Sequence, residues 1–287
     1  MEAPNMDLKD KTILITGSTD GVGRVVAQRL GAAGAHVLVH GRDATRGKAT
    51  VTEIETAGGK SDFLAADLAS LAEVRRLAET VRARTDRLDI LINNAGIGTA
   101  GTKRQVSADG YELRFAVNYL AGFLLTSELL PLLKASAPAR IVNVASAGQR
   151  AIDFSDVMLT RSYDGARAYC QSKLAQILFT IDLAEQLKGS GVTVNALHPA
   201  SYMNTTMVRQ AGVTPWSSVE TGAEAILNLA TSPDLEGRSG LYFDGLRESR
   251  ADAQAYDANA RKRLRALSLD LVGDAISNPS TSKEEHS

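Results

Sequence analysis

Short apolar runs alternate with amphipathic stretches along most of the chain, and this alternation predicts its fold. Residues 11–16, KTILIT, form a β-branched apolar run that ends at glycines, which is typical of a buried strand. The next stretch, 22–34, has helical periodicity and ends at Gly34, a residue suited to a helix C-terminus. Further strands, separated by helical stretches, are expected at 35–40, 61–68, 88–96, 139–146, 192–198 and 239–245.

Strands that alternate with helices in this way indicate βαβ units, in which parallel strands share one sheet and helices cover both faces. The sequence therefore predicts an α/β fold: a single-domain, doubly wound Rossmann fold with a central parallel sheet of about seven strands. We expect a catalytic domain over 1–245, because the composition does not change before that point. A helical extension over 246–275 and a disordered tail over 276–287 should follow.

The composition excludes several classes of function. With 32 basic and 33 acidic residues and a net charge of −1, the chain offers no basic face for nucleic acid. Cys170 is the only cysteine, which rules out an internal disulfide, and the four histidines lack ligand spacing, so no metal site is expected. Residues 1–11 are too polar for a signal peptide, and no long apolar run suggests a membrane span. A cytoplasmic protein without membrane contact is expected, and formation of a homo-oligomer is left open.

A glycine-rich turn follows the first predicted strand and opens the first predicted helix. Gly17, Gly21 and Gly23 in TGSTDGVG allow a tight turn and a close approach to a pyrophosphate at the positive helix N-terminus. The spacing differs from the usual G-x-G-x-x-G, and a glycine-rich turn alone also fits simple turn chemistry. Its place between strand and helix favours a dinucleotide site.

The end of the second strand indicates which dinucleotide. Enzymes that prefer NAD usually place a carboxylate there, whereas this chain has Gly41 followed by Arg42, which suits a 2′-phosphate and favours NADP(H). Asp43 is interpreted as a cap of the next helix. Asp67, after the third strand, fits two roles equally well: a hydrogen bond to the adenine amino group or a helix cap.

Tyr169 and Lys173 lie four residues apart on one predicted helix, so their side chains share a face. An ammonium near a phenol lowers the phenol's pKa from about 10, which would make Tyr169 a proton donor usable near neutral pH. The Tyr-x-x-x-Lys pattern is short enough to occur by chance, so both residues could also be surface residues of an amphipathic helix.

Read in order, TGSTDGVG, NNAG at 93–96, Asn118 in FAVNYLAG, Ser146 in VNVASAG and the Tyr-x-x-x-Lys pair resemble the short-chain dehydrogenase/reductase family over roughly residues 10–245. His198-Pro199 and the AYCQSKLA helix are most similar to the branch of retinol-dehydrogenase-like carbonyl reductases.

The resemblance implies a role for each catalytic residue. Tyr169 is the general acid or base, and Ser146 donates a hydrogen bond to the substrate oxygen. Lys173 holds the nicotinamide ribose and lowers the pKa of Tyr169, and Asn118 holds a water that links Lys173 to solvent. The implied NADP(H)-binding residues are Gly17, Ser18, Thr19, Asp20, Gly21, Val22, Gly23, Arg42, Asp67, Leu68, Asn94, Ala95, Gly96, Tyr169, Lys173, Pro199 and Thr205.

The chain departs from the family pattern in three places. The stretch 147–168, between Ser146 and Tyr169, is longer than in most members, as it is in the retinol-dehydrogenase-like branch. The usual Pro-Gly after the sixth strand is Pro199-Ala200, which puts the shape of the following loop in doubt. Thr205 stands one residue late for a carboxamide contact.

The loops 147–168 and 199–220 follow strands five and six and should form the substrate site, because ligands bind at the carboxyl ends of open α/β sheets. Its expected members are Ser146, Tyr202, Met203, Met207 and Trp216, although such side chains also pack loops against a core. The sequence predicts an NADP(H)-dependent oxidoreductase for a bulky, largely apolar ketone or aldehyde and its alcohol. The alternative is a non-catalytic NADP(H)-binding sensor or scaffold on the same fold.

Overall fold

The computed structural model describes residues 8–101 and 103–277, and its described part contains one eight-stranded sheet in the order β3-β2-β1-β4-β5-β6-β7-β8. Neighbouring strands are parallel except β7 and β8, which are antiparallel. The strands are β1 (Thr12–Ile15), β2 (His36–Gly41), β3 (Lys60–Ala65), β4 (Ile90–Asn93), β5 (Ala139–Val144), β6 (Val192–His198), β7 (Tyr242–Asp244) and β8 (Arg247–Ser249).

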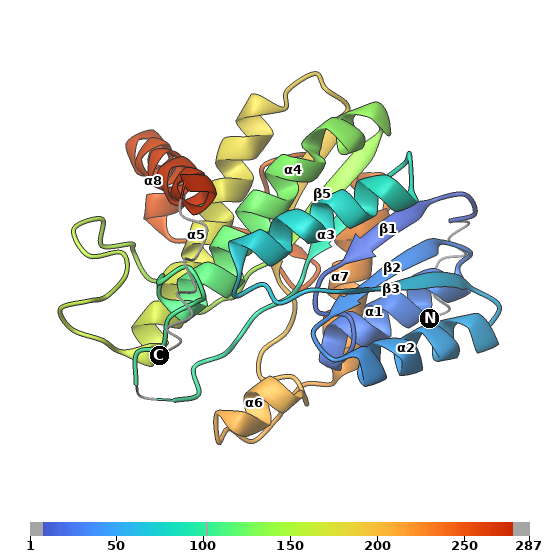
Figure 1. Ribbon diagram of the computed structural model, residues 1–287, viewed down its shortest axis with the longest axis horizontal. Coiled ribbons are helices and arrows are strands. Elements are labelled where there is room, and N and C mark those ends of the chain that lie inside the picture. The colour runs from blue at the N-terminus through green and yellow to red at the C-terminus, as the bar shows by residue number, and fades with distance from the viewer. Residues whose placement is uncertain (1–7, 102, 278–287) are drawn as a thin grey trace, which may run out of the picture.

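Helices cover both faces of this sheet, as a doubly wound fold requires (Figure 1). One apolar core lies between the sheet and α3, α4 and α5, and a second lies between the sheet and α1, α2 and α7. The helical elements are α1 (Gly21–Ala32), α2 (Ala44–Thr56), α3 (Leu71–Arg84), the π-helical turn η1 (Phe115–Leu120), α4 (Ala121–Ala135), α5 (Gly165–Gln186), α6 (Thr206–Gln210), α7 (Val219–Thr231), the short η2 (Pro233–Leu235) and η3 (Ala253–Tyr256), and α8 (Ala258–Ser277).

The strand order places the functional edge of the sheet. β1 lies between β2 and β4, so the chain winds outward in opposite directions from the β1/β4 pair. The loops after these two strands therefore diverge to opposite faces, and the crevice between them at their carboxyl ends is where open α/β sheets bind ligands. Side chains along β1 alternate between the two cores, with Leu14 in one and Ile13 and Ile15 in the other.

The predicted Rossmann fold is confirmed, and the strand count is one higher than expected. The additional strand, β8, pairs with β7 through Asp244 and Arg247, on either side of a tight turn that contains Gly245 at φ 58°. It lies inside the segment 246–275 that we expected to be helical, so helix α8 begins only at Ala258. Most of the tail 276–287 lies outside the described residues.

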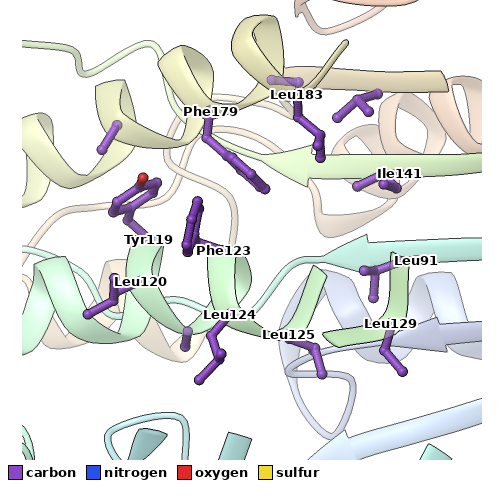
Figure 2. Close-up of a cluster of buried hydrophobic side chains, with 14 of the residues drawn as sticks. Leu91, Tyr119, Leu120, Phe123, Leu124, Leu125, Leu129, Ile141, Phe179 and Leu183 are labelled. Carbon is purple, nitrogen blue, oxygen red and sulfur yellow. The ribbon is translucent and has the colours of Figure 1, made fainter. Parts of the chain in front are cut away.

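Helix α8 packs along α5 beside a cluster of aromatic side chains that joins α4 and α5 (Figures 1 and 2). Phe123 and Phe179 meet with ring centroids 5.3 Å apart, and Tyr119 packs beside both. Arg265 and Arg261 of α8 form ion pairs of 3.1 and 2.8 Å with carboxylates of α5. Because α8 also contributes buried apolar side chains, the extension is part of the main core rather than an appendage.

By length and hydropathy alone, 115–135 could cross a membrane, and among the described residues it is the one helix that meets this test. However, 61% of its most apolar window is buried inside the protein. A helix between a sheet and two neighbouring helices is apolar because it belongs to a core.

The buried hydroxyls of Tyr119 in η1 and Ser268 in α8 provide a stability test of the contact between these two elements. Ser268 donates its only proton to the Leu264 carbonyl at 2.7 Å, so the Tyr119 hydroxyl must be the donor in the 2.7 Å bond between the two side chains. Ser268→Ala leaves that donor buried without an acceptor and should cost about 1–3 kcal/mol of unfolding free energy. Tyr119→Phe should destabilise the native chain by about 1 kcal/mol but stabilise the Ser268→Ala variant. Urea unfolding of the four proteins measures this, and the same sign in both backgrounds would contradict the assigned donor.

Candidate functional site

The glycine-rich turn lies between β1 and α1 and has the backbone shape that its glycines allow. Gly17 and Gly21 have φ values of 64° and 54°, a region that residues with a side chain seldom adopt. Asp20 caps α1 by accepting a 2.7 Å hydrogen bond from the Gly21 N–H. A side chain on Gly23 would collide with Asn94, so this glycine is required for close packing.

The loop after β4 fastens this turn through Thr16 and Asn94. The Asn94 side-chain amide donates to the carbonyls of Thr16 and Gly17 at 2.9 and 3.0 Å. In return, the Thr16 hydroxyl accepts from the backbone N–H groups of Asn94 and Ala95 at 3.0 and 3.1 Å. Four hydrogen bonds therefore join the carboxyl ends of β1 and β4.

His40, at the end of β2, also supports the glycine turn. From the sequence it was considered only as one of four scattered histidines. Its Nδ1 accepts a hydrogen bond from the Gly17 N–H at 3.1 Å, which requires a neutral ring. The side chain is 2% exposed, and burial lowers its pKa to about 4. The sequence position that could have indicated this role is the one directly before Gly41, at the end of the strand that lies beside the glycine turn.

The adenosine end of the site carries more positive charge than the sequence analysis assigned. A side chain on Gly41 would lie 2.6 Å from the Thr19 hydroxyl, so no carboxylate fits there without displacing Thr19. Arg42 is exposed and lies 3.8 Å from Asp67. Arg46, which sequence reasoning missed, lies on the first turn of α2 at 3.6 Å from Asp20.

The two aspartates near this end have different roles. Asp43 caps α2 by accepting from the N–H groups of Thr45 and Arg46, as the sequence predicted. Asp67 accepts from Ala69 in a tight turn at 3.0 Å, while Ser70 is the cap of α3. The capping alternative for Asp67 is therefore wrong, because the helix begins at Leu71, four residues later, and Ser70 caps it.

Tyr169 and Lys173 lie on the same face of α5, as their spacing predicted, with the ammonium 5.9 Å from the phenol ring centroid. The buried Ser146 follows β5, so the turn after the strand carries it to the same edge of the sheet. Gly148 packs against Ser146 and Tyr169 and donates its N–H to the Ser146 hydroxyl at 3.0 Å. The structure thus brings Ser146, Tyr169 and Lys173 together, and Asn118, the fourth predicted catalytic residue, lies beside the same turn of α5.

The expectation that Lys173 lowers the pKa of Tyr169 is wrong for this structure. Burial raises the pKa of Tyr169, and the Ser146 hydroxyl opposes that rise. Burial also lowers the pKa of Lys173 to about 7, so its charge is itself weakened near neutral pH. Sequence spacing shows that two groups share a face, but not that both are removed from water.

Asn118 lies in the π-helical turn η1, a type of helix distortion frequent at functional sites. Its Oδ1 accepts from the Ile97 N–H at 2.7 Å, and its Nδ2 donates to the Ile97 carbonyl at 3.1 Å and to the Ser172 hydroxyl at 2.9 Å. A side chain on Gly96 would lie 3.3 Å from this amide and 3.4 Å from the Lys173 ammonium. Asn118 therefore links the loop after β4 to the catalytic turn of α5.

The segment after β6 lies beside the nucleotide end. Thr205, a predicted cofactor residue, caps α6 and approaches Gly21, and the Thr206 hydroxyl donates to Asp20 at 2.8 Å. This segment therefore contacts the glycine turn directly.

The predicted substrate side chains of this segment divide into two groups. Met207 packs against Gly98 after β4, and Met203 packs against Gly222 of α7, which is the packing alternative that the sequence left open. The rings of Tyr202 and Trp216 meet edge to face with centroids 5.1 Å apart, and Trp216 is 74% exposed. Tyr202 has a φ of 45°, a strained value for a residue with a side chain.

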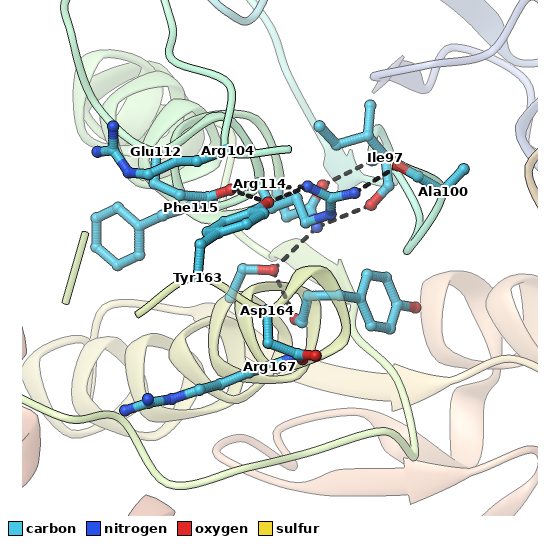
Figure 3. A network of polar contacts seen from close by, with 12 residues as sticks. Ile97, Ala100, Arg104, Glu112, Arg114, Phe115, Tyr163, Asp164 and Arg167 are labelled. Atoms are coloured by element: carbon cyan, nitrogen blue, oxygen red, sulfur yellow. Dashed lines mark hydrogen bonds and ion pairs between the residues drawn. The ribbon is translucent and has the colours of Figure 1, made fainter. Parts of the chain in front are cut away.

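The long loop before α5 is fastened by a buried cluster that sequence reasoning missed (Figure 3). Arg114 donates to the carbonyls of Gly98 and Ala100 at 2.8 and 2.6 Å and to the Tyr163 hydroxyl. Tyr163 in turn donates to Glu112 at 3.1 Å. No short motif marks this cluster, because its members come from three separate segments.

Comparison with known proteins agrees with this geometry. Residues 11–215 match the family model described as short chain dehydrogenase. The chain belongs to the short-chain dehydrogenase family. It is an oxidoreductase, and the family uses NAD(P).

Among related proteins, human retinol dehydrogenase 13 is 40% identical over 92% of this chain and 85% of its own length. A Pseudomonas aeruginosa RhlG structure in complex with NADP is 30% identical, with a TM-score of 0.69 over 84% of this chain and 97% of that one. The landomycin C-6 ketoreductase LanV, solved with NADP and rabelomycin, is 28% identical, with a TM-score of 0.66 over 83% and 96%. The predicted likeness of this short-chain dehydrogenase to retinol dehydrogenases is confirmed.

The role of His40 in this dehydrogenase predicts a specific pH dependence of stability. In the unfolded chain a histidine has a pKa of about 6.5, against about 4 in the fold, so the folded state resists protonation. Its contribution to stability is complete above pH 6.5 and falls by about 3 kcal/mol as the pH drops to 4. His40→Asn keeps an acceptor for Gly17 but removes the titration, so its unfolding free energy should fall less over this range. Urea unfolding at pH 7, 5.5 and 4.5 tests this; equal pH slopes for both proteins would contradict it.

Proposed function

We propose that this short-chain dehydrogenase is an NADP(H)-dependent reductase that interconverts a bulky, largely apolar ketone or aldehyde with its alcohol. The observation that carries the proposal is the convergence of Ser146, Tyr169 and Lys173 at the carboxyl edge of the sheet, beside a glycine turn shaped for a pyrophosphate. The sensor or scaffold alternative explains neither why Tyr169 and Lys173 are both retained nor why Lys173 is buried.

In the proposed reaction, each residue has a role that its surroundings suit. Tyr169 transfers a proton to the carbonyl oxygen, and because burial raises its pKa it keeps that proton at neutral pH. Ser146 donates a hydrogen bond to the same oxygen as negative charge develops. The nicotinamide, when bound, supplies the hydride. In its charged form Lys173 holds the nicotinamide ribose by donating a hydrogen bond to it. The water relay through Asn118 stays a prediction, because its amide already bonds Ile97 and Ser172.

The residues at the adenosine end fit NADP(H) better than NAD(H). Gly41 leaves no carboxylate to bind a ribose 2′-hydroxyl, and Thr19 fills the space where one would lie. Arg42 and Arg46 are exposed guanidinium groups able to bind a phosphate. Arg42 would exchange its loose contact with Asp67 for a 2′-phosphate, and Asp67 would then be free to bond the adenine.

Two observations support a bulky substrate. The loop 147–168 is long and is held by the Arg114–Tyr163 contact, so it adds a fixed wall beside Ser146. Tyr202 and Trp216 supply exposed aromatic surface on the segment after β6. The ketoreductase relative solved with rabelomycin and the retinol dehydrogenases are named for ligands in keeping with this class. The cytoplasmic location and the absence of membrane and nucleic-acid partners stay predictions.

A carbonyl panel tests the function directly. With NADPH, we expect the wild-type protein to reduce aromatic or polycyclic ketones and retinoid-like aldehydes with a higher kcat/KM than short polar carbonyls. Tyr169→Phe removes only the transferable proton and should lower kcat by about 10²–10⁴-fold while NADPH binding, followed by cofactor fluorescence, stays within a few fold. A Tyr169→Phe variant that retained most of its turnover would exclude the assigned acid. A wild-type preference for short polar substrates would exclude the assigned pocket.

Arg42→Ala tests the choice of cofactor. The variant should weaken NADPH binding by about tenfold to a hundredfold, the loss expected for one charge-assisted hydrogen bond to phosphate. NADH, which lacks the 2′-phosphate, is the matched control and should lose far less. Equal changes in the two dissociation constants would show that Arg42 does not bind the phosphate.

A further inference from the structure

The ammonium of Lys173 is held by two groups, and one of them lies outside the residues that the family resemblance assigns. Lys173 Nζ donates to the Val144 carbonyl at 2.8 Å and to the side-chain Oε1 of Gln176 at 3.0 Å. An ammonium has three N–H donors, so one remains for a further group. Under the proposed function, that group is a ribose hydroxyl.

Gln176 is built into the catalytic turn of α5. It lies three residues after Lys173, on the same face of the helix, and is 4% exposed. Its own carbonyl accepts from the Thr180 hydroxyl at 2.8 Å, and Thr180 accepts from the Asn143 amide of β5 at 2.8 Å. This chain of bonds fixes the turn of α5 that carries Gln176 against the strand whose last carbonyl, that of Val144, binds the same ammonium.

We propose that Gln176 is a positioning residue of the catalytic site, whose side-chain oxygen holds the Lys173 ammonium in place and stabilises its charged form. The proposal rests on the function argued above, in which Lys173 acts as a cation. No carboxylate among the described residues forms an ion pair with Lys173, and burial lowers the lysine's pKa to about 7. An amide oxygen that accepts from an ammonium acts against that loss of charge.

Few other charged groups face the ammonium. Tyr169 lies on its own helix, and His198 lies at the end of β6. Burial lowers the pKa of His198, the charge of Asp244 opposes this, and the charge of Lys173 adds to the lowering. Tyr169 and His198 are both unchanged in variants of Gln176. A difference in pH dependence between those variants and the wild type therefore reports on Lys173.

The direction in which each Gln176 variant shifts the pKa of Lys173 depends on whether the new side chain favours the charged or the neutral lysine. Gln176→Met removes the acceptor at similar volume, so the pKa of Lys173 should fall. Gln176→Glu places a carboxylate there, so the pKa should rise. Because ketone reduction needs the charged lysine, kcat should decline with rising pH at a midpoint about one unit lower in the Met variant and about one unit higher in the Glu variant.

Gln171 offers a matched control on the same helix. It is also a glutamine with 4% exposure, but it donates to the Ala151 carbonyl instead of contacting Lys173. Gln171→Met should cost comparable stability in urea unfolding and leave the alkaline midpoint of kcat where it is in the wild type.

The experiment records kcat, and separately the NADPH dissociation constant, over a pH range that extends at least two units to either side of the Lys173 pKa of about 7, for the wild type and the three variants. Opposite shifts in Gln176→Met and Gln176→Glu, with Gln171→Met unmoved, support the proposal. Unmoved midpoints in both Gln176 variants, or an equal shift in Gln171→Met, would overturn it. If the wild type reduced no carbonyl, the proposed function would fail. The pH dependence of NADPH binding would then decide the role of Gln176 by the same comparison.

Discussion

The junction of Thr16 with Asn94 is the constraint on which the site depends. Parallel strands β1 and β4 end side by side, and without side chains to join them their following loops would diverge to opposite faces of the sheet. The four hydrogen bonds between Thr16, Gly17, Asn94 and Ala95 hold the loops together at their start. The glycine turn then faces the nucleotide crevice from one side, and Gly96 meets Lys173 and Asn118 from the other. The glycine turn and Lys173 are therefore both positioned by one element, the loop after β4.

A row of buried amides and hydroxyls extends this constraint across the sheet. Asn93 donates to Thr126 of α4 and to Asn143 of β5, and Asn143 donates to Thr180 of α5. Polar groups in an apolar core are costly unless paired, and the pairing fixes which side chains must face one another. Asn93 Oδ1 is one of the few buried atoms left without a partner among the described residues. The row links both helices of one face to the strands beneath the catalytic edge.

The sequence predicted the parts of this protein that depend on local patterns. Apolar runs gave the strands β1 to β7, the Asp43 cap was correct, and the four-residue spacing placed Tyr169 and Lys173 on one face. β8 was not predicted because a strand of three exposed polar residues, Arg247–Ser249, carries no apolar signal. The capping alternative for Asp67 was wrong for a different reason, since Ser70, three residues later, is an equally suitable cap.

What depends on tertiary burial could not be predicted in this way. The role of His40 depends on its ring lying against Gly17, twenty-three residues away in the chain, and the clamp of Arg114 on Tyr163 joins segments still farther apart. The predicted lowering of the Tyr169 pKa was wrong because burial raises this pKa. Burial also weakens the positive charge of the neighbouring Lys173. Sequence motifs indicate which side chains meet, whereas burial determines the protonation state of each.

Helix α5 is fastened on both sides of its catalytic turn, which explains how a buried lysine can be held in one place. Toward its end, Asp182 and Glu185 pair with arginines of α8, while its first turn follows the loop that Arg114 and Tyr163 hold. Between these points, Gln176 and the Val144 carbonyl orient Lys173. By contrast, Trp216 and Tyr202 lie exposed on a segment that contacts the site through Thr206 and Met207. The hydrogen bonds and ion pairs thus hold the turn where the proton transfer is proposed. The surface proposed to select the substrate lies instead on exposed side chains beside α6, a helix without buried residues, where substitutions need not disturb the catalytic turn.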